Sequence, residues 1–187
     1  MKKTLTLLAI AVLATASHAA TVKWTIGGQS TFVLNGVTGA PYASMPVYLI
    51  SAADLSSITN PEMSKDDFDA ALAAITIAST TSAANGTKPT DMNSTEVTSD
   101  KMTAGATMLF GALVVSEDAT AGYYKVLTTS VAPYADDAPS TARTGNVRTA
   151  WNTINNQSWT KAYAVPEPSV ALMGLLGLGM LIKRRRA

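Results

Sequence analysis

The chain has 187 residues, no cysteine, one histidine and a formal net charge of +1 at pH 7. Its histidine, His18, lies in the N-terminal segment, so residues 20–164 contain neither histidine nor cysteine. The same residues carry eight lysines and arginines against twelve aspartates and glutamates, a net charge of −4. This composition argues against Ser-His-Asp and Cys-His catalysis, against the usual zinc and copper sites, and against nucleic-acid binding, which needs a basic patch.

Residues 1–19 have the three parts of a secretory signal peptide. Two lysines follow the initiating methionine, an apolar stretch runs from about Leu5 to Ala16, and Ser17 and Ala19 occupy the small-x-small positions before a cut. The apolar stretch is too short for a membrane helix and lacks a stop-transfer flank. The sequence therefore predicts a signal peptide over residues 1–19 and export of the chain from residue 20 onward.

Short strands are predicted at the start of the exported part. Residues 21–26 alternate partly between apolar and polar, and residues 31–34 precede the turn pair Asn35-Gly36. These two strands are expected to form a β-hairpin or meander. After them, the apolar run from Met45 to Ile50 is rich in β-branched and aromatic residues, which favours a buried strand.

One helix is predicted within residues 60–75. Ser64 is placed as its N-cap, with Asp67 three residues later as the acid of a capping box. Apolar residues then recur at helical spacing, at Phe68, Ala71, Leu72 and Ile75. Asp66, Asp67 and Asp69 also admit a second interpretation as metal ligands, but the helix dipole favours acidic residues in a first turn without any metal.

The next segment, residues 79–100, is rich in Ser, Thr, Asn, Gly and Pro and is predicted to be a surface loop with one edge strand near residues 95–98. Two clear strands come after it, over residues 106–116 and 123–131. The polar residues 117–122 between them indicate a turn, so the pair is expected to form an antiparallel hairpin.

This pattern favours a mainly β fold over residues 20–164. We expect an antiparallel β-sandwich with one short inserted helix, for which an immunoglobulin-like layout is one arrangement. Residues 147–154 fit a strand and a short helix equally well. Trp24, Trp151 and Trp159 are expected to pack in the core or at its rim, with a sugar-binding platform as the alternative.

Several short motifs could carry a chemical function, but the surrounding sequence accounts for their residues without one. The pairs Glu117-Asp118 and Asp136-Asp137 could serve a glycosidase that uses two carboxylates, although both lie in predicted turns where solvent accounts for them. Residues 85–87, 93–95 and 156–158 match the glycosylation triplet, which is common by chance in Thr-rich sequence. We therefore predict no catalytic residue, no metal site and no cofactor.

The last 23 residues, 165–187, have three parts in a fixed order. The first is Val165, Pro166, Glu167 and Pro168, in which the prolines favour an extended backbone that a protease can bind. The second, residues 169–182, has no charge and would form a helix of about 21 Å against a hydrocarbon core of about 30 Å. The third is Lys183, Arg184, Arg185 and Arg186, which the positive-inside rule keeps in the cytoplasm.

These three parts together resemble the tripartite PEP-CTERM sorting signal of bacterial exported proteins. The resemblance covers residues 165–187 only. It implies recognition of Pro166-Glu167-Pro168 by a membrane-embedded exosortase, cleavage near that motif, and delivery to the cell envelope or extracellular matrix, often alongside exopolysaccharide production. In such proteins the region between the two signals carries no shared activity.

Three functions remain open from the sequence. The favoured one is an exported, non-enzymatic surface or matrix protein that passes through an inner-membrane intermediate and is processed by an exosortase-type protease, with exopolysaccharide or envelope components as partners. The second is a permanent single-pass anchor, which would keep residues 183–186. The third is a carbohydrate-active enzyme with paired carboxylates, which would lose hydrolysis on replacement of one acid.

Overall fold

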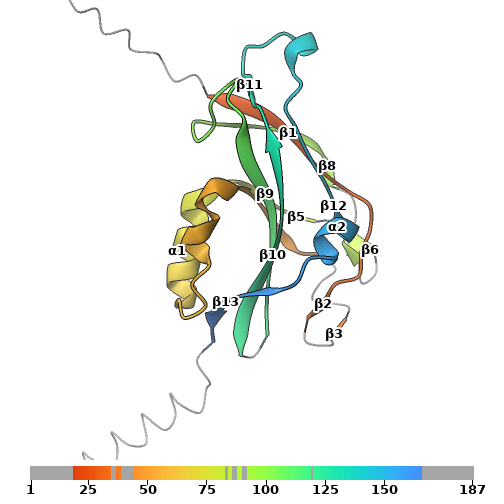
Figure 1. Ribbon diagram of the computed structural model, residues 1–187. Coiled ribbons are helices and arrows are strands. Elements are labelled where there is room, and N and C mark those ends of the chain that lie inside the picture. The colour runs from red at the N-terminus through yellow and green to blue at the C-terminus, as the bar shows by residue number, and fades with distance from the viewer. Residues whose placement is uncertain are drawn as a thin grey trace, which may run out of the picture.

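The computed structural model describes residues 19–34, 37–38, 44–82, 84–85, 88–89, 92–118 and 120–165. Its elements are β1 (Ala20–Gly27), β2 (Val33–Leu34), β3 (Val37–Thr38), β4 (Pro46–Ser51), η1 (Ala52–Ile58), α1 (Lys65–Ile75), β5 (Thr76–Thr81), β6 (Ala84–Asn85), β7 (Lys88–Pro89), β8 (Met92–Ser99), β9 (Met108–Glu117), β10 (Ala121–Val131), β11 (Tyr134–Ala135), η2 (Ser140–Ala142), β12 (Asn146–Ala150), α2 (Trp151–Asn155) and β13 (Thr160–Ala164). The fold is mainly β, with antiparallel sheets and few helices, and is consistent with the expected β-sandwich (Figure 1). The predicted signal peptide and C-terminal helix lie outside the described residues.

The larger sheet has five strands in the order β13-β10-β9-β4-β5, and every neighbouring pair is antiparallel. At its centre, β9 and β10 pair along their length and confirm the hairpin predicted over residues 106–116 and 123–131. Asp118 closes the turn between them, because its Oδ1 accepts hydrogen bonds at 2.8 Å from the backbone N–H groups of Thr120 and Ala121. Asp118 is thus a turn residue, as an Asx-type side chain often is.

The smaller sheet is built around β1, which pairs with β8 and β11 in antiparallel fashion and with β12 in parallel fashion. The predicted hairpin between residues 21–26 and 31–34 is wrong, since β2 pairs instead with β3. The edges of β1 are covered instead by strands distant in sequence: β8, β11 and β12. The parallel pair, which places Trp24 opposite Val147, departs from the all-antiparallel expectation.

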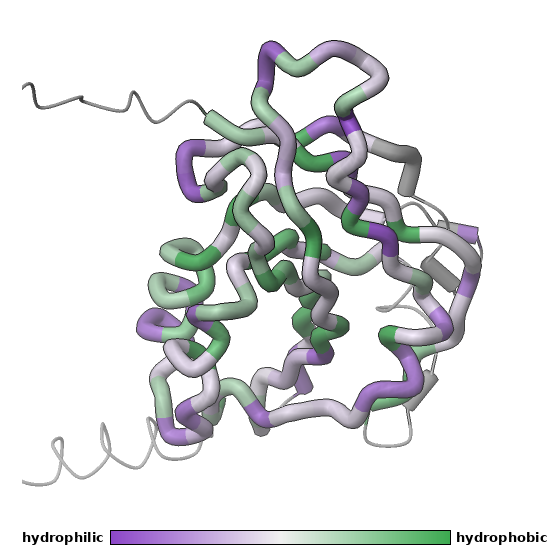
Figure 2. Tube along the Cα trace, turned by 45° about the horizontal axis from the view of Figure 1, so that its top comes forward, coloured by the Kyte–Doolittle hydropathy of each residue, from purple (hydrophilic) through white to green (hydrophobic). Residues whose placement is uncertain are grey.

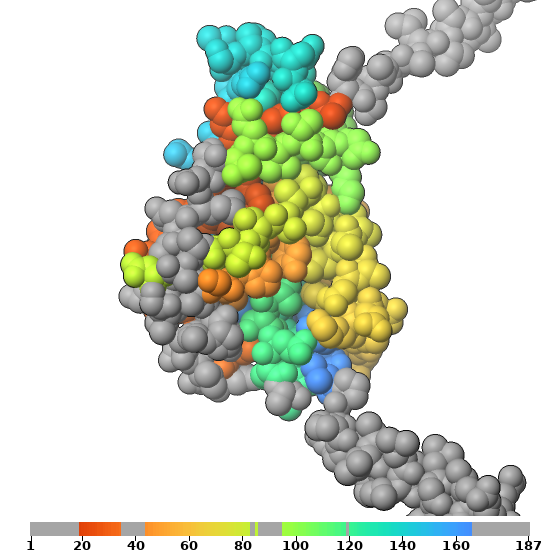
Figure 3. Space-filling view, turned by 180° about the vertical axis from the view of Figure 1, so that it is seen from behind, coloured from red at the N-terminus to blue at the C-terminus, as the bar shows by residue number. Residues whose placement is uncertain are grey.

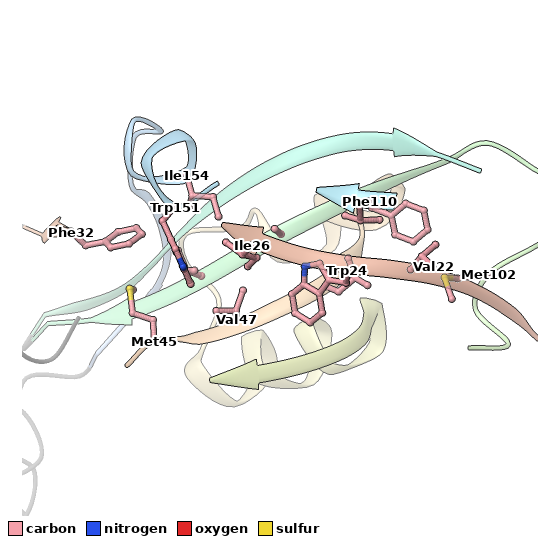
Figure 4. Packing of buried hydrophobic residues seen from close by; sticks show 14 of the residues in the cluster. Val22, Trp24, Ile26, Phe32, Met45, Val47, Met102, Phe110, Trp151 and Ile154 are labelled. Atoms are coloured by element: carbon pink, nitrogen blue, oxygen red, sulfur yellow. The ribbon is translucent and has the colours of Figure 1, made fainter. Parts of the chain in front are cut away.

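The two sheets face each other across the main hydrophobic core (Figure 4). Val22, Trp24 and Ile26 of β1 point into this core, and alternate residues of β4 and β9 meet them from the larger sheet. Trp151, at the start of α2, is fully buried in the same cluster, and Phe32 contacts its edge at a centroid distance of 5.9 Å. Trp24 and Trp151 are therefore packing residues, as the sequence predicted.

A second core lies on the opposite face of the larger sheet. There Ile50, Leu113 and Tyr124 of the sheet pack against Phe68 and Leu72 of α1. Because successive residues of a strand point to opposite faces, Leu49 enters the first core and Ile50 the second, and both are fully buried. Burial on both faces accounts for the continuous apolar runs of β4 and β9.

The predicted helix is confirmed as α1. Ser64 caps it as expected: the Ser64 Oγ accepts a hydrogen bond at 3.1 Å from the Asp67 backbone N–H, and the Ser64 hydroxyl donates one at 2.7 Å to the Asp67 carboxylate. The buried face consists of Phe68, Leu72 and Ile75, with Ala71 partly buried. At the other end, Lys101 Nζ donates to the carbonyl oxygens of Ala73 and Ala74 in the last turn of α1 and of Thr76, its C-cap residue. A cation is favourable at this end of a helix, where the last carbonyl groups lack partners within the helix.

Two segments are more regular than the sequence indicated. The composition of residues 79–100 predicts a loop, but β5 begins before this segment and continues into it, and the edge strand expected at residues 95–98 is the longer β8. Both strands are rich in Ser and Thr, and their pairing with β4 and β1 outweighs that composition. Residues 147–154 contain both predicted states, since β12 is followed directly by α2.

The described chain begins and finishes at opposite ends of the domain. Figures 1 and 3 both show the start of β1 at one end, near β11, and β13 at the other end, beside α1. Figure 2 shows the hydrophobic segments gathered between the layers, while hydrophilic segments occupy peripheral turns. The last residues of the domain therefore leave from the end where the β9–β10 turn and the start of α1 meet.

Candidate functional site

Of the residues predicted to form the sorting signal, only Val165 is described, and it is the last described residue. Pro166, Glu167, Pro168 and the basic cluster Lys183, Arg184, Arg185 and Arg186 lie outside the described residues. Val165 is fixed to the domain, because its backbone N–H donates a hydrogen bond at 2.9 Å to the carbonyl oxygen of Thr120. Its side chain also packs against the second core.

Strand β13, just before Val165, is an edge strand of the larger sheet. It pairs with the first residues of β10, with a register shift near Tyr163. Ala162 and Tyr163 are 0% and 1% exposed, so this short strand is anchored by its side chains as well as its backbone. The Tyr163 ring lies over Gly122, where any Cβ would collide with it. Gly122 is needed here because only a residue without Cβ allows this close approach.

A polar cluster engages the hydroxyl group of Tyr163. The Tyr163 hydroxyl donates a hydrogen bond at 2.7 Å to Glu117 Oε2 and accepts one at 3.3 Å from Lys65 Nζ. Lys65 Nζ also lies 3.5 Å from the Glu117 carboxylate and 5.0 Å from the centroid of the Tyr163 ring. We call Tyr163, Glu117 and Lys65 the Tyr163 latch. It joins β13 to the end of β9 and the start of α1.

The electrostatics of the latch favour its present protonation state. Burial and the hydrogen bond to Glu117 raise the pKa of Tyr163 to about 12. Burial alone would lower the pKa of Lys65, but its interactions with the Tyr163 hydroxyl and with Asp69, 3.3 Å away, raise it above the ordinary value. Tyr163 is thus a neutral phenol near pH 7, which suits a structural donor better than a nucleophile or base.

Two hollows flank α1, and Lys65 contributes to both. The larger, about 470 Å³, lies between α1 and strands β4 and β5, and is lined by Tyr48, Lys65, Asp69, Leu72, Ala73, Thr76 and Ser79. The smaller, about 340 Å³, lies next to Ala164 and is lined otherwise by residues 62–66. The Lys65 and Asp69 side chains are about half exposed and pair with each other, so their charges are already compensated.

Most acids of the pairs proposed for carboxylate catalysis make structural contacts. Glu117 belongs to the Tyr163 latch and Asp118 closes the β9–β10 turn. Asp136 accepts hydrogen bonds at 3.1 and 3.3 Å from the hydroxyls of Thr21 and Thr98. These contacts give three of the four acids a structural role.

The first-turn acids of α1 are likewise engaged, with Asp67 in the cap and Asp69 paired with Lys65. Among the described residues, no group of three His, Cys, Asp or Glu side chains is close enough to hold a metal ion. Within the same part of the chain, no helix has the length and apolar character needed to cross a membrane.

Comparison with known proteins identifies no relative of this chain. No family model, curated protein or solved structure matches this chain. The contribution of the domain to function must therefore be inferred from its own residues.

Trp159, the partly exposed tryptophan, is held by packing. Its Nε1 donates a hydrogen bond at 2.6 Å to the Val33 carbonyl oxygen. Lys125 Nζ lies 4.7 Å from the Trp159 ring centroid and 5.5 Å from that of Phe32, and donates at 2.8 Å to the Asn155 carbonyl oxygen. Burial lowers the pKa of Lys125, and this carbonyl, in the last turn of α2, offsets part of that cost.

Sequence reasoning missed the latch. Lys65, Glu117 and Tyr163 are far apart in the chain, and each has an ordinary local explanation as a first-turn helix residue, a turn acid or a strand aromatic. Gly122, which the sequence places in the turn over residues 117–122, lies in β10 instead, and a glycine inside a strand often marks the close approach of another chain segment. Of the glycosylation triplets, Asn85 and Asn156 are exposed.

Proposed function

We propose that this chain is an exported, non-enzymatic surface or extracellular-matrix protein. Residues 1–19 direct export, residues 20–164 form the exported β-sandwich domain, for which an immunoglobulin-like layout is one arrangement, and residues 165–187 are a PEP-CTERM-type sorting signal. An exosortase-type membrane protease recognises Pro166, Glu167 and Pro168, within the sorting signal that starts at Val165, and trims the tail. The predicted transmembrane helix and the cytoplasmic cluster Lys183–Arg186 hold the chain in the inner membrane until then.

The order of three features at the C-terminal side of the domain carries this proposal. A Pro-Glu-Pro motif, an uncharged stretch and four basic residues succeed one another directly. The structure bears on it at one point: Val165, the residue directly before Pro166, is held to the domain by its backbone hydrogen bond to Thr120.

The passive role of the domain has separate support. The exported part has no histidine or cysteine, and three of its four paired acids are engaged: Glu117 in the Tyr163 latch, Asp118 in the β9–β10 turn, and Asp136 with threonines of β1 and β8. Surface or matrix proteins of this kind act through adhesion or as structural material. Exopolysaccharide and other envelope components are accordingly the partners that we propose.

Replacement of the motif's glutamate tests the sorting function. In cells that carry the processing protease, Glu167→Ala should leave export intact but retain the full-length chain in the inner membrane. Asp137→Ala is a suitable control, since it removes an exposed carboxylate from the turn after β11, at the opposite end of the domain from β13. Release of Glu167→Ala at the level of wild type and of Asp137→Ala would refute the proposal.

A further inference from the structure

The chain just before the sorting motif is part of the fold. Residues 160–164 form β13, which pairs with β10, and the next backbone N–H, that of Val165, is bonded to Thr120. A protease cleft binds its substrate as an extended segment on both sides of the bond that it cuts. Paired and buried backbone enters such a cleft only after local opening of the fold.

The anchoring of β13 is stronger than its length suggests. Ala162 and Tyr163 are fully buried, the Tyr163 ring stacks obliquely on Phe68 at a centroid distance of 5.1 Å, and the Tyr163 latch closes over its hydroxyl. Opening β13 would expose this ring and leave Glu117 and Lys65 without their shared partner. The latch therefore makes the opening rare, beyond what four pairs of backbone positions would achieve.

We propose that docked β13 confines processing to peptide bonds C-terminal to Val165, and that Tyr163 is the positioning residue that keeps it docked. This inference rests on the proposed sorting function. In the reaction, water hydrolyses one peptide bond: its oxygen becomes part of the new carboxylate on the domain side, and the departing tail keeps the new amine. The fold thus sets the N-terminal limit of the cut, while the motif itself attracts the protease.

Residue-level mass spectrometry of the released protein tests the position of the cut. The domain product should end at Val165 or at a later residue. A product that ends at Ala164 or earlier would overturn the inference while the proposed function stood, because trimming would still have occurred. Protein found outside the cell with its whole tail would instead refute the proposed function. The shielding by β13 would then be tested by hydrogen exchange alone.

Hydrogen exchange on the purified full-length chain tests the latch without any protease. The amides of Ala162 and Tyr163 should exchange far more slowly than those of an unstructured peptide, and Tyr163→Phe should speed their exchange about five- to tenfold through loss of a buried hydrogen bond. Tyr48→Phe, which removes a hydroxyl from β4, is the matched control and should leave these amides unchanged. Peptide-like exchange of β13 in the wild type, or equal exchange in wild type and Tyr163→Phe, would overturn the inference. Thermal unfolding of both variants verifies that they fold.

Discussion

The two sheets differ in what covers them. The five-stranded sheet is buried on both faces, by the other sheet on one side and by α1 and η1 on the other. Among the described residues, the four-stranded sheet has no helix layer on its outer face, where Lys23 and Thr25 of β1 remain partly exposed although Thr21 is buried. The sequence carries this difference, since β4 and β9 are continuous apolar runs whereas β1 and β12 alternate.

This difference bears on function because of where β13 lies. The strand that precedes the proposed sorting motif belongs to the sheet that is covered on both faces, and Tyr163 reaches the core under α1. The first described strand, β1, belongs to the other sheet. The end of the domain that leads to the proposed processing site is thus held by a layer beyond the two facing sheets.

The largest expected effect contrasts the outer faces of the two sheets. Leu113→Ala should lower the free energy of unfolding by about 2–5 kcal/mol, because Leu113 is fully buried under α1. Thr25→Ala, on the outer face of β1, should change it by no more than about 0.5 kcal/mol. Denaturant titration of both variants measures the contrast, and equal losses would show that the two outer faces do not differ.

A second, smaller effect contrasts two glycines in strands. Gly122→Ala places a methyl group against the Tyr163 ring and should cost about 1–3 kcal/mol, together with displacement of β13. Gly27→Ala in β1 meets no atom within 4 Å and serves as the matched control. Thermal unfolding should separate the two variants clearly. If Gly122→Ala were as stable as Gly27→Ala, β13 would not be packed as described.

The smallest effect concerns the Tyr163 latch at alkaline pH. The pKa of Tyr163 is raised to about 12 from its ordinary value of 10.0, so its neutral form favours the folded state. This contribution is complete below pH 10 and is lost as the pH rises through 12. The stability difference between wild type and Tyr163→Phe should therefore shrink from about pH 9 to 12 in denaturant titrations. A difference that stayed constant over this range would contradict the latch.

Local patterns predicted the elements whose partners are near in sequence. The cap at Ser64 and the apolar stripe from Phe68 to Ile75 indicated α1, and the turn around Asp118 indicated the β9–β10 hairpin. Both depend on interactions within a few residues or across one turn, so composition and period reveal them.

Distant pairings could not be predicted in this way. The parallel alignment of β1 with β12 joins segments that are far apart in the sequence. The position of β5 at the edge of the larger sheet is likewise not expected from its loop-like composition. The contact of Tyr163 with Lys65 and Glu117 has no periodic signature either. Such features are selected by tertiary packing, which overrides local propensity.

Intact-mass measurement of the protein recovered from the envelope and the culture medium tests the central claim most directly. We expect a chain without its first 19 residues and without Lys183–Arg186, because the protease removes the basic segment before release. A released chain that still carried these four basic residues would contradict the account.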